Sequence, residues 1–356
     1  MIEPKSVLTG KIFSGEPVVS VCVITYNHEK YIRQCLDGIL MQEVTFPYEI
    51  LIHDDASPDN TAEIIREYEA KYPEIIKPIY QTANQYSQGI DVGKYNFERA
   101  VGKYIALCEG DDYWTDPKKL QMQVDFLEKH PEYVGTAHKS MTVNASSIPI
   151  KGLADAWITE KTSLDFTLND IVHYRLPGST ASLVFRNIFK KLEISTQKDY
   201  YNLPGPGDQK LSVILLMSGK IYRFSKIMSA YRYVTTNSTS WTASNQGKNL
   251  YGENYRYSIA VNSFCMNKFK VDINTYALSI GLIISSIHRY IRHPSKDNRE
   301  VLNTIYYLSK LERKYTQNML KKLILCPFET TKIITRIWKE RKEISMMLSQ
   351  KNRDFD

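Results

Sequence analysis

Hydrophobic and polar positions alternate between two patterns over residues 17–130. Short runs rich in β-branched residues predict strands, and the segments between them place apolar side chains at helical spacing. After the second run, Asp59 or Asn60 can cap a helix that carries Ile64, Ile65 and Tyr68 on one face. Alternation of strands and helices predicts a parallel sheet with helices on both faces. The predicted strands cover residues 18–24, 49–52, 75–80 and 103–107.

The later parts of the chain follow other patterns. Thr115 and Asp116 are typical N-cap residues, and Pro117 fits the first position of a further helix. Beyond residue 130 the spacing is less regular, although a turn rich in Pro and Gly at 203–207 precedes a predicted helix over 208–217. From about residue 241 the pattern is helical and increasingly basic. We therefore predict one α/β domain over residues 1–240, with halves 18–130 and 131–240, followed by a basic helical extension over 241–356.

The composition narrows the class of protein. The chain has 356 residues, of which 43% are hydrophobic and 24% charged, which is typical of a globular protein. Its five cysteines are odd in number and form no Cys-x-x-Cys pair, which argues against a disulfide framework or a structural zinc site. No secretory signal is recognisable at the N-terminus, and the apolar stretch 276–284 is far shorter than the ~20 residues of a spanning helix. These features predict a cytoplasmic protein, and the net charge of +7 suggests an anionic partner.

Polar residues follow three of the predicted strands at the point where each strand ends. In an open parallel sheet, ligands bind outside the carboxyl ends of the strands. Each polar group alone could be a turn or a helix cap, but three at the same edge favour a binding site. The groups are Thr25-Tyr26-Asn27, Asp54-Asp55 and Glu109-Gly110-Asp111-Asp112.

The acidic cluster of residues 109–112 predicts a bound cation. Neighbouring carboxylates repel one another, and oxygen ligands suit Mg²⁺ or Mn²⁺, which keep coordination positions for substrate phosphates. Such a metal neutralises charge on a departing diphosphate, here a nucleoside diphosphate. Neither G-x-x-x-x-G-K nor G-x-G-x-x-G occurs in the chain, which removes the main support for an ATPase or a dinucleotide dehydrogenase.

Three segments together resemble the nucleotide-sugar half of family 2 glycosyltransferases. The segments are VSVCVITYNHEKYIRQCLDGIL, EILIHDDASPDNT and GKYIALCEGDDYWTDPKKLQMQVDFL. The resemblance implies the GT-A fold, a Rossmann-like mixed sheet flanked by helices. It also implies an inverting transferase that moves a sugar from a UDP-sugar to an acceptor hydroxyl. As acceptor, the resemblance implies a lipid-linked glycan of bacterial O-antigen, capsule or exopolysaccharide synthesis, for which polyprenyl diphosphate is a candidate carrier.

The resemblance also assigns roles to residues at the strand ends. By motif position, Thr25, Tyr26, Asn27 and Asp55 would hold the base and ribose of the nucleotide. Glu109-Gly110-Asp111 would be the Asp-x-Asp element, with Asp111 as the main ligand of Mn²⁺ or Mg²⁺. Its first acid is Glu instead of the more usual Asp, and the longer side chain could reach the ribose or the metal. Asp112 could be another ligand or a support for one.

Two further residues are assigned by the same resemblance. An inverting transferase needs a base for the acceptor hydroxyl, and Asp208 at the start of the predicted helix fits the position of that base. Aspartate is also a favoured N-cap, so a capping role stays open. Arg232 resembles a residue of a mobile loop that holds the diphosphate, where a guanidinium binds bidentately. A solvated arginine is the alternative.

The C-terminal residues 310–342 mix Lys and Arg with Leu, Ile, Phe and Trp. This pattern is typical of a helix on an anionic membrane surface, although a helix packed on the domain would show the same pattern. No nucleic-acid-binding module is recognisable, so we expect no nucleic-acid partner. Two other functions compete with a transferase. A sugar nucleotidyltransferase would need a glycine-rich basic loop, which is absent, and a non-catalytic nucleotide-sugar or membrane-surface protein would not need the complete set of acids.

Overall fold

The structure, a computed structural model, describes residues 15–150, 164–171, 176–234 and 248–325, with single residues at 243, 245, 331 and 335. The chain divides into two compact units. The first contains residues 1–167, 176–202 and 214–244. The second contains residues 168–175, 203–213 and 245–356. Residues 203–213, predicted as part of the α/β domain, are therefore grouped with the C-terminal helices.

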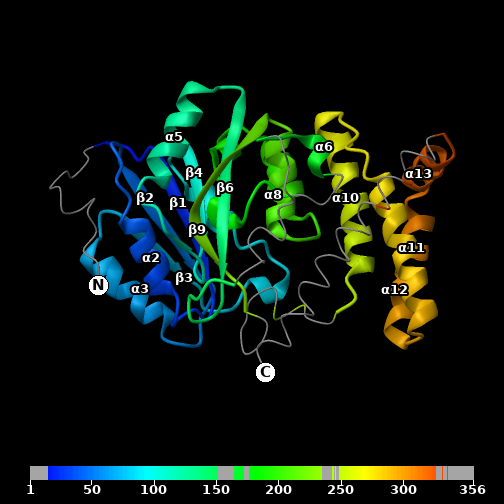
Figure 1. The fold of residues 1–356 in the computed structure, drawn as a ribbon, viewed down its shortest axis with the longest axis horizontal. Helices are drawn as coiled ribbons and strands as arrows, with labels where there is room; N and C mark the ends of the chain where they lie inside the picture. Colours follow the sequence, from blue (N-terminus) through cyan, green and yellow to red (C-terminus); the bar gives the residue numbers. More distant parts are fainter. Residues whose placement is uncertain are drawn as a thin grey trace. The chain divides into compact units, whose positions relative to one another are not determined.

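The first unit is built on a nine-stranded sheet, of which four neighbouring strands are parallel. Three of them are almost fully buried, which explains their largely hydrophobic sequences, whereas only the first residue of the fourth, Ile76–Tyr80, is buried. Figure 1 shows these strands with α2 (Ile32–Leu40) and α3 (Thr61–Lys71) beside them. All four strands predicted from the sequence are present, with ends shifted by no more than two residues. In spatial order they are β3 (Ile76–Tyr80), β2 (Tyr48–Asp54), β1 (Val19–Thr25) and β4 (Tyr104–Glu109).

The other half of the sheet is mixed. β8 (Val184–Arg186) pairs antiparallel with β4 and with β6 (Tyr133–Val143). β6 then pairs in parallel with β9 (Lys220–Arg232), which also pairs antiparallel with β5 (Tyr113–Trp114) and β7 (Asp165–Phe166). The mixed sheet flanked by helices confirms the predicted GT-A type of fold.

Helices of the first unit use the apolar faces predicted from their spacing. In α2 (Ile32–Leu40), Ile32, Leu36 and Ile39 are fully buried in the core. Asn60 occupies the N-cap position of α3 (Thr61–Lys71) without a side-chain cap, and Asp59 Oδ1 accepts from the Thr61 amide at 3.0 Å. The remaining helices are α4 (Lys94–Arg99), α5 (Lys119–Lys129) and α7 (Ile194–Tyr201), with short 3₁₀ turns at Tyr86–Gln88, Thr180–Ser182 and Ile188–Lys190.

The predicted start of α5 is wrong by two residues. The helix begins at Lys119 instead of Pro117, because Asp116 forms a separate turn in which its carboxylate accepts from the Lys118 amide. The backbone amide of Thr115 donates to Met228 of β9, so Thr115 extends the sheet pairing and does not cap the helix.

The second unit is mainly helical. Its core contains Tyr255, Leu282, Ile305 and Tyr315, and the Tyr315 hydroxyl lies 2.7 Å from Oγ of Ser279. None of the described helices is both long and apolar enough to cross a membrane. Apart from the single residues 331 and 335, residues 326–342 of the predicted surface-binding segment lie outside the described ranges. The helices are α6 (Leu168–Ile171), α8 (Gly207–Leu216), α10 (Tyr251–Phe269), α11 (Tyr276–Arg292), α12 (Lys296–Leu311) and α13 (Arg313–Leu325), and the boundary between the units passes through α8.

Candidate functional site

The three polar strand ends predicted as a site come together at one edge of the sheet. β1 lies between β2 and β4, so the ends of these strands are neighbours. The Asp55 amide donates to the Thr25 carbonyl at 3.0 Å, and the Gly110 amide donates to the Ile24 carbonyl at 2.9 Å. Thr25, Asp55 and the 109–112 turn are therefore joined directly through their backbones.

The loop after β1 is fastened to the loop after β2. The Asn27 amide donates to Ser57 Oγ at 2.9 Å, and Ser57 Oγ donates to Asp54 Oδ1 at 2.5 Å. Asn27 and Ala56 have φ of 60° and 61°, a left-handed conformation that is uncommon for residues other than glycine. The hydrogen bonds hold this conformation, which leaves the Asn27 side chain exposed and Tyr26 partly buried.

His28 connects the end of β1 with the acidic turn. Its Nδ1 lies 3.1 Å from Thr25 Oγ1, and its Nε2 lies 3.8 Å from Asp111 Oδ2. Gly110 permits this approach, because a Cβ there would lie 2.5 Å from Thr25 Oγ1 and 2.9 Å from His28 Nδ1. We did not identify His28 from the sequence; the available signal was an imidazole three residues after a strand end that already carried polar groups.

Asp55 organises the loop that precedes the Tyr86–Gln88 turn. Its side chain is buried, and its two oxygens accept from the amides of Gln85 at 2.8 Å and Tyr86 at 3.0 Å. The Tyr86 ring is 64% exposed. Partial desolvation, and then the charges of Glu109 and Asp91, raise the pKa of the Tyr86 hydroxyl. Tyr86 is a second candidate residue that the sequence patterns did not reveal.

His53 lies beneath Asp55 as a neutral side chain. Burial lowers its pKa to about 4, and its ring stacks on Tyr95 with 4.8 Å between centroids. His53 Nε2 is 4.0 Å from Asp55 Oδ1 and 3.1 Å from Gln81 Nε2. Because the imidazole is uncharged at neutral pH, the contact with Asp55 is not an ion pair.

The acids of the 109–112 turn differ in exposure. Glu109 and Asp111 are partly exposed, whereas Asp112 is 1% exposed. Asp112 Oδ1 accepts from the Arg232 amide at 2.8 Å, and Oδ2 has no hydrogen-bond partner in the described part of the chain. Burial, and then the charges of Asp111 and Glu109, raise the pKa of Asp112. Its position favours a supporting role over direct contact with a metal.

The donor atoms of this turn fit a hard cation. They are carboxylate oxygens, the ligands that Mg²⁺ and Mn²⁺ prefer, and Glu109 and Asp111 are both partly exposed. Within the described ranges, no three His, Cys, Asp or Glu side chains form a metal cluster. Asp111 and Glu109 could therefore provide only part of a coordination sphere, and substrate or water oxygens would complete it.

Arg232 occupies the end of β9, and the structure does not place it in the predicted mobile loop. Its guanidinium is buried against the Tyr31 ring, with 4.3 Å to the centroid. Nε donates to the Asp111 carbonyl at 2.8 Å, and Nη2 donates to Gln34 Oε1 at 2.8 Å. Nη1 donates to the carbonyls of residues 144 and 145. Every guanidinium nitrogen is thus engaged with protein acceptors, which favours a structural role at Asp111 over the predicted contact with a diphosphate.

Asp208 lies in the first turn of α8 and belongs to the second unit. Its Oδ1 accepts from the adjacent Gln209 amide at 2.7 Å, and burial raises the pKa of its carboxyl group. A raised pKa brings a carboxylate closer to the range useful for proton transfer at neutral pH. The predicted role of Asp208 as a base remains a prediction.

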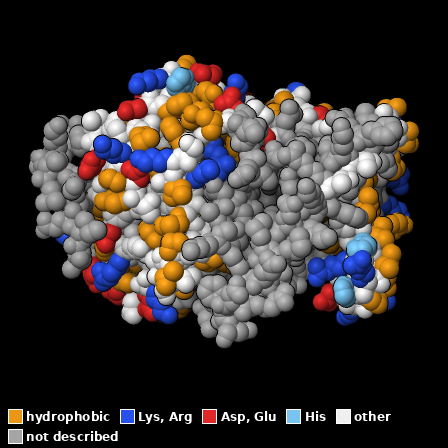
Figure 2. Space-filling view, viewed as in Figure 1, with side chains coloured by type: hydrophobic (Ala, Val, Ile, Leu, Met, Phe, Trp, Pro, Cys, Tyr) orange, Lys and Arg blue, Asp and Glu red, His pale blue; other side chains and the backbone are white. Residues whose placement is uncertain are grey.

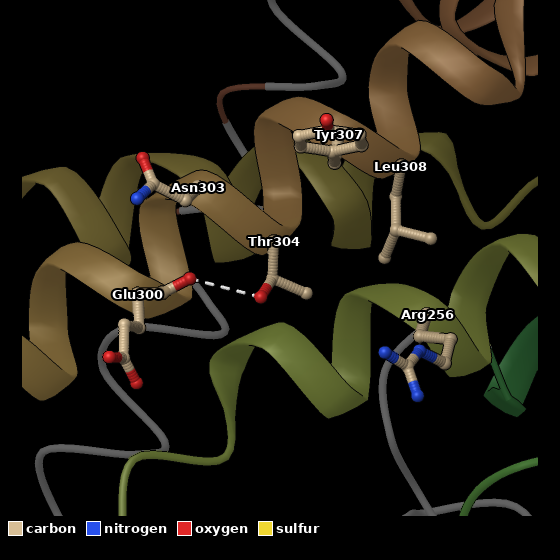
Figure 3. A pocket seen from close by; sticks show the side chains of 6 residues that line it. All are labelled: Arg256, Glu300, Asn303, Thr304, Tyr307 and Leu308. Atoms are coloured by element: carbon tan, nitrogen blue, oxygen red, sulfur yellow. Dashed lines mark hydrogen bonds between the residues drawn. The ribbon is translucent and has the colours of Figure 1, made fainter.

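A cavity of about 430 Å³ lies between α10 and α12, entirely within the second unit. Figure 3 shows Arg256 of α10 facing Thr304 and Leu308 of α12, while the Thr304 hydroxyl donates to the Glu300 carbonyl. The residues that line the cavity include one basic side chain, Arg256, and one acidic side chain, Glu300. None of them belongs to the strand-end motifs. The acidic turn is therefore the stronger candidate for chemistry.

The mixed sheet flanked by helices has the GT-A type of fold. Residues 20–192, just under half of the chain, match the model of Glycosyl transferase family 2. The match includes all of the strand-end motifs and ends before Asp208 and Arg232.

Several known proteins are similar to this chain. An uncharacterized protein of Mycobacterium tuberculosis is 36% identical over 220 residues, or 60% of this chain, and the alignment spans 58% of that protein. TuaG of Bacillus subtilis, named as a teichuronic acid biosynthesis glycosyltransferase, is 27% identical over 71% of this chain and 95% of its own length. The crystal structure of S. aureus TarS 1–349 with UDP-GlcNAc aligns with a TM-score of 0.61 at 17% identity, covering 93% of this chain and 91% of that one. The likeness to TarS concerns the fold.

Proposed function

We propose that this protein is an inverting glycosyltransferase that moves a sugar from a UDP-sugar to an acceptor hydroxyl. The observation that carries the proposal is the meeting of Thr25, Asp55 and Asp111 at one sheet edge, joined through backbone hydrogen bonds and His28. Ligands of open α/β sheets bind at this edge. The UDP-GlcNAc complex of TarS, which has a similar fold, supports a uridine nucleotide as donor.

The nucleotide would lie against the loops that follow β1 and β2. Asn27 is exposed and offers an amide for hydrogen bonds to the base or ribose, and Tyr26 lies beside it. The exposed Tyr86 ring provides a surface on which a base can stack. Asp55 holds this loop in place through the amides of Gln85 and Tyr86.

Mn²⁺ or Mg²⁺ would be held by Asp111 and Glu109 together with the donor diphosphate. A bound divalent cation stabilises the negative charge that develops on the leaving nucleoside diphosphate. The protein keeps Asp111 in position through His28 Nε2 on its carboxylate and Arg232 Nε on its carbonyl. Asp112 supports the turn from behind, where its Oδ1 accepts from the Arg232 amide.

Asp208 would accept the proton of the acceptor hydroxyl as that oxygen attacks the anomeric carbon. The proposal rests on the family resemblance and on the raised pKa of this carboxyl group. The acceptor we propose is a polyprenyl-diphosphate-linked glycan of bacterial surface polysaccharide, used at the cytoplasmic face of the membrane. The name of TuaG supports this acceptor class.

A panel of nucleotide sugars, incubated with and without Mn²⁺ or Mg²⁺, tests the function. We expect hydrolysis or transfer with one uridine donor, its loss in excess chelator, and recovery on adding metal. Asp111→Asn should reduce turnover by at least ~100-fold, because the charge that screens the diphosphate is weakened. Full turnover in chelator would refute the metal assignment. Exchange of sugar 1-phosphate with nucleoside triphosphate would indicate a nucleotidyltransferase, and tight donor binding without turnover would indicate a non-catalytic protein.

A further inference from the structure

Helix α11 carries a stripe of isoleucines on its outer face. Ile284, Ile287 and Ile291 follow one another at spacings of three and four residues, so they lie on one side of the helix. Their side chains are 37%, 45% and 72% exposed. The opposite side of α11 contributes Leu282 to the core of the second unit. A helix on the surface of a domain normally exposes a polar face there, so this second apolar face requires an explanation.

Basic residues accompany the stripe. Arg292 and His288 are exposed on the same side of α11, one turn apart. Residues 276–325 contain nine Lys or Arg and only three Asp or Glu, so this segment carries most of the formal net charge of +7. Figure 2 shows hydrophobic side chains along the edge formed by the C-terminal helices, next to Lys, Arg and His side chains.

We propose that the outer face of α11 docks on an anionic lipid bilayer. Branched aliphatic side chains enter the boundary between headgroups and acyl chains, while adjacent arginines remain at the level of the lipid phosphates. A second copy of the chain is a poor partner for this face. A two-fold interface would bring the basic residues beside the stripe close to the same residues of the other copy, and they would repel one another. No described helix can span a bilayer, so the contact is at the surface.

The docking surface shares no residue with the proposed sugar-transfer chemistry. It consists of α11 residues, whereas the strand-end site belongs to the first unit and Asp208 lies in α8. It also differs from the segment 310–342 predicted from the sequence. Failure of the lipid test would leave donor hydrolysis unaffected, and failure of the donor panel would leave the lipid test valid.

Sedimentation of the full chain with vesicles tests the proposal. Vesicles of phosphatidylglycerol and phosphatidylcholine are compared with phosphatidylcholine alone, at 0.1 M and 0.5 M salt. We expect binding to the anionic vesicles only, and weaker binding at high salt. The double variant Ile287→Ser/Ile291→Ser should weaken binding by about 100-fold, or tenfold (~1.4 kcal/mol) for each side chain. Arg292→Gln should weaken it about fivefold.

Ile194→Ser is the matched control, since Ile194 is 86% exposed on α7 of the first unit. It should bind like the wild type, and all variants should keep the wild-type melting temperature because the replaced side chains are exposed. Ile291→Trp should strengthen binding severalfold, which no folding defect would mimic. Equal binding to neutral vesicles, or wild-type binding by the double variant, would overturn the proposal. Self-association without lipid that the double variant abolishes would instead assign the face to a second copy.

Discussion

At the scale of single residues, the site depends on a close approach between the end of β1 and the acidic turn. His28 contacts Thr25 with one ring nitrogen and Asp111 with the other, and Gly110 provides the space between them. A side chain at position 110 must displace either the strand end or the imidazole. Even a single methyl group at position 110 should therefore displace the Asp111 carboxylate.

Gly110→Ala should reduce kcat/KM by at least ~10-fold, because a Cβ 2.5 Å from Thr25 Oγ1 forces the turn away from β1. Steady-state kinetics with the preferred donor would measure this effect. Gly252→Ala in α10 is the control, since its Cβ would meet only ordinary contacts at 3.6 Å or more. Normal kinetics for Gly110→Ala would show that the acidic turn tolerates movement.

Lys119 is an unusual core residue that the chemistry does not use. Its side chain is fully buried, with Nζ 3.9 Å from the centre of the Trp114 ring and without a hydrogen bond in the described part of the chain. Burial lowers its pKa to about 7. Between this value and the ordinary pKa of 10.5, the unfolded chain binds more protons than the folded one, so the stability of the folded state rises with pH in this window.

Lys119→Met should therefore stabilise the protein most at low pH. We expect the melting temperature to rise by a few degrees at pH 6.5, where the lysine must be buried with its charge, and the gain to shrink by pH 9.5. Loss of the contact between the ammonium and Trp114 offsets about 0.5–2 kcal/mol of the gain. Thermal unfolding of both proteins at several pH values measures the difference. A gain that is independent of pH would show that the charge is not the cause.

At the scale of elements, the first turn of α8 gives Asp208 two possible roles. A carboxylate near the N-terminus of a helix stabilises the unpaired amides of the first turn, and Asp208 accepts from Gln209 in this way. Its raised pKa also suits a base. Since asparagine caps helices about as well as aspartate, one substitution separates these roles.

Asp208→Asn should lower the rate of transfer by ~10²–10⁴-fold, the usual contribution of a general base. Donor and metal binding and the melting temperature should remain near the wild-type values. Asp199→Asn in α7 is the control and should transfer normally. A variant of Asp208 that transfers at the wild-type rate would leave it as a helix residue and direct attention to Asp170, or to Asp199 if Asp199→Asn loses transfer.

At the scale of the whole molecule, the strand-end residues belong to one compact unit and Asp208 to the other. Variants of the two units therefore test the proposed donor binding and the proposed proton transfer one at a time. Asp55 fixes the loop that carries Tyr86. We therefore expect Asp55 to determine how much a bound nucleotide stabilises the first unit.

UDP should raise the melting temperature of the wild type. A ligand at 100 times its Kd stabilises the folded state by ~2.7 kcal/mol. Asp55→Asn should lose much of this shift, since an amide nitrogen cannot accept from the Tyr86 amide as the carboxylate oxygen does. Asp116→Asn, which weakens a comparable turn at the Lys118 amide, should retain the shift. An equal shift in both variants would show that the loop does not contribute to nucleotide binding.

The sequence by itself determined the local features of this protein. The four parallel strands, the apolar face of α2 and the start of α3 after Asp59-Asn60 follow from the order of neighbouring residues, since strand and helix periodicity are short-range properties. The strand-end groups could be placed at one edge because parallel strands all end on the same side. The family resemblance then connected that edge with sugar transfer.

Only the tertiary structure decided which partners the polar side chains have. Arg232 donates to Gln34, 198 residues away in the chain, and no local pattern encodes that contact. The link through His28, the burial of Asp112 and the exposure of the isoleucine stripe on α11 depend on the same long-range packing. Hydrophobic periodicity reports which face of an element is apolar. It does not report what lies opposite that face, because this is fixed only when distant segments pack together.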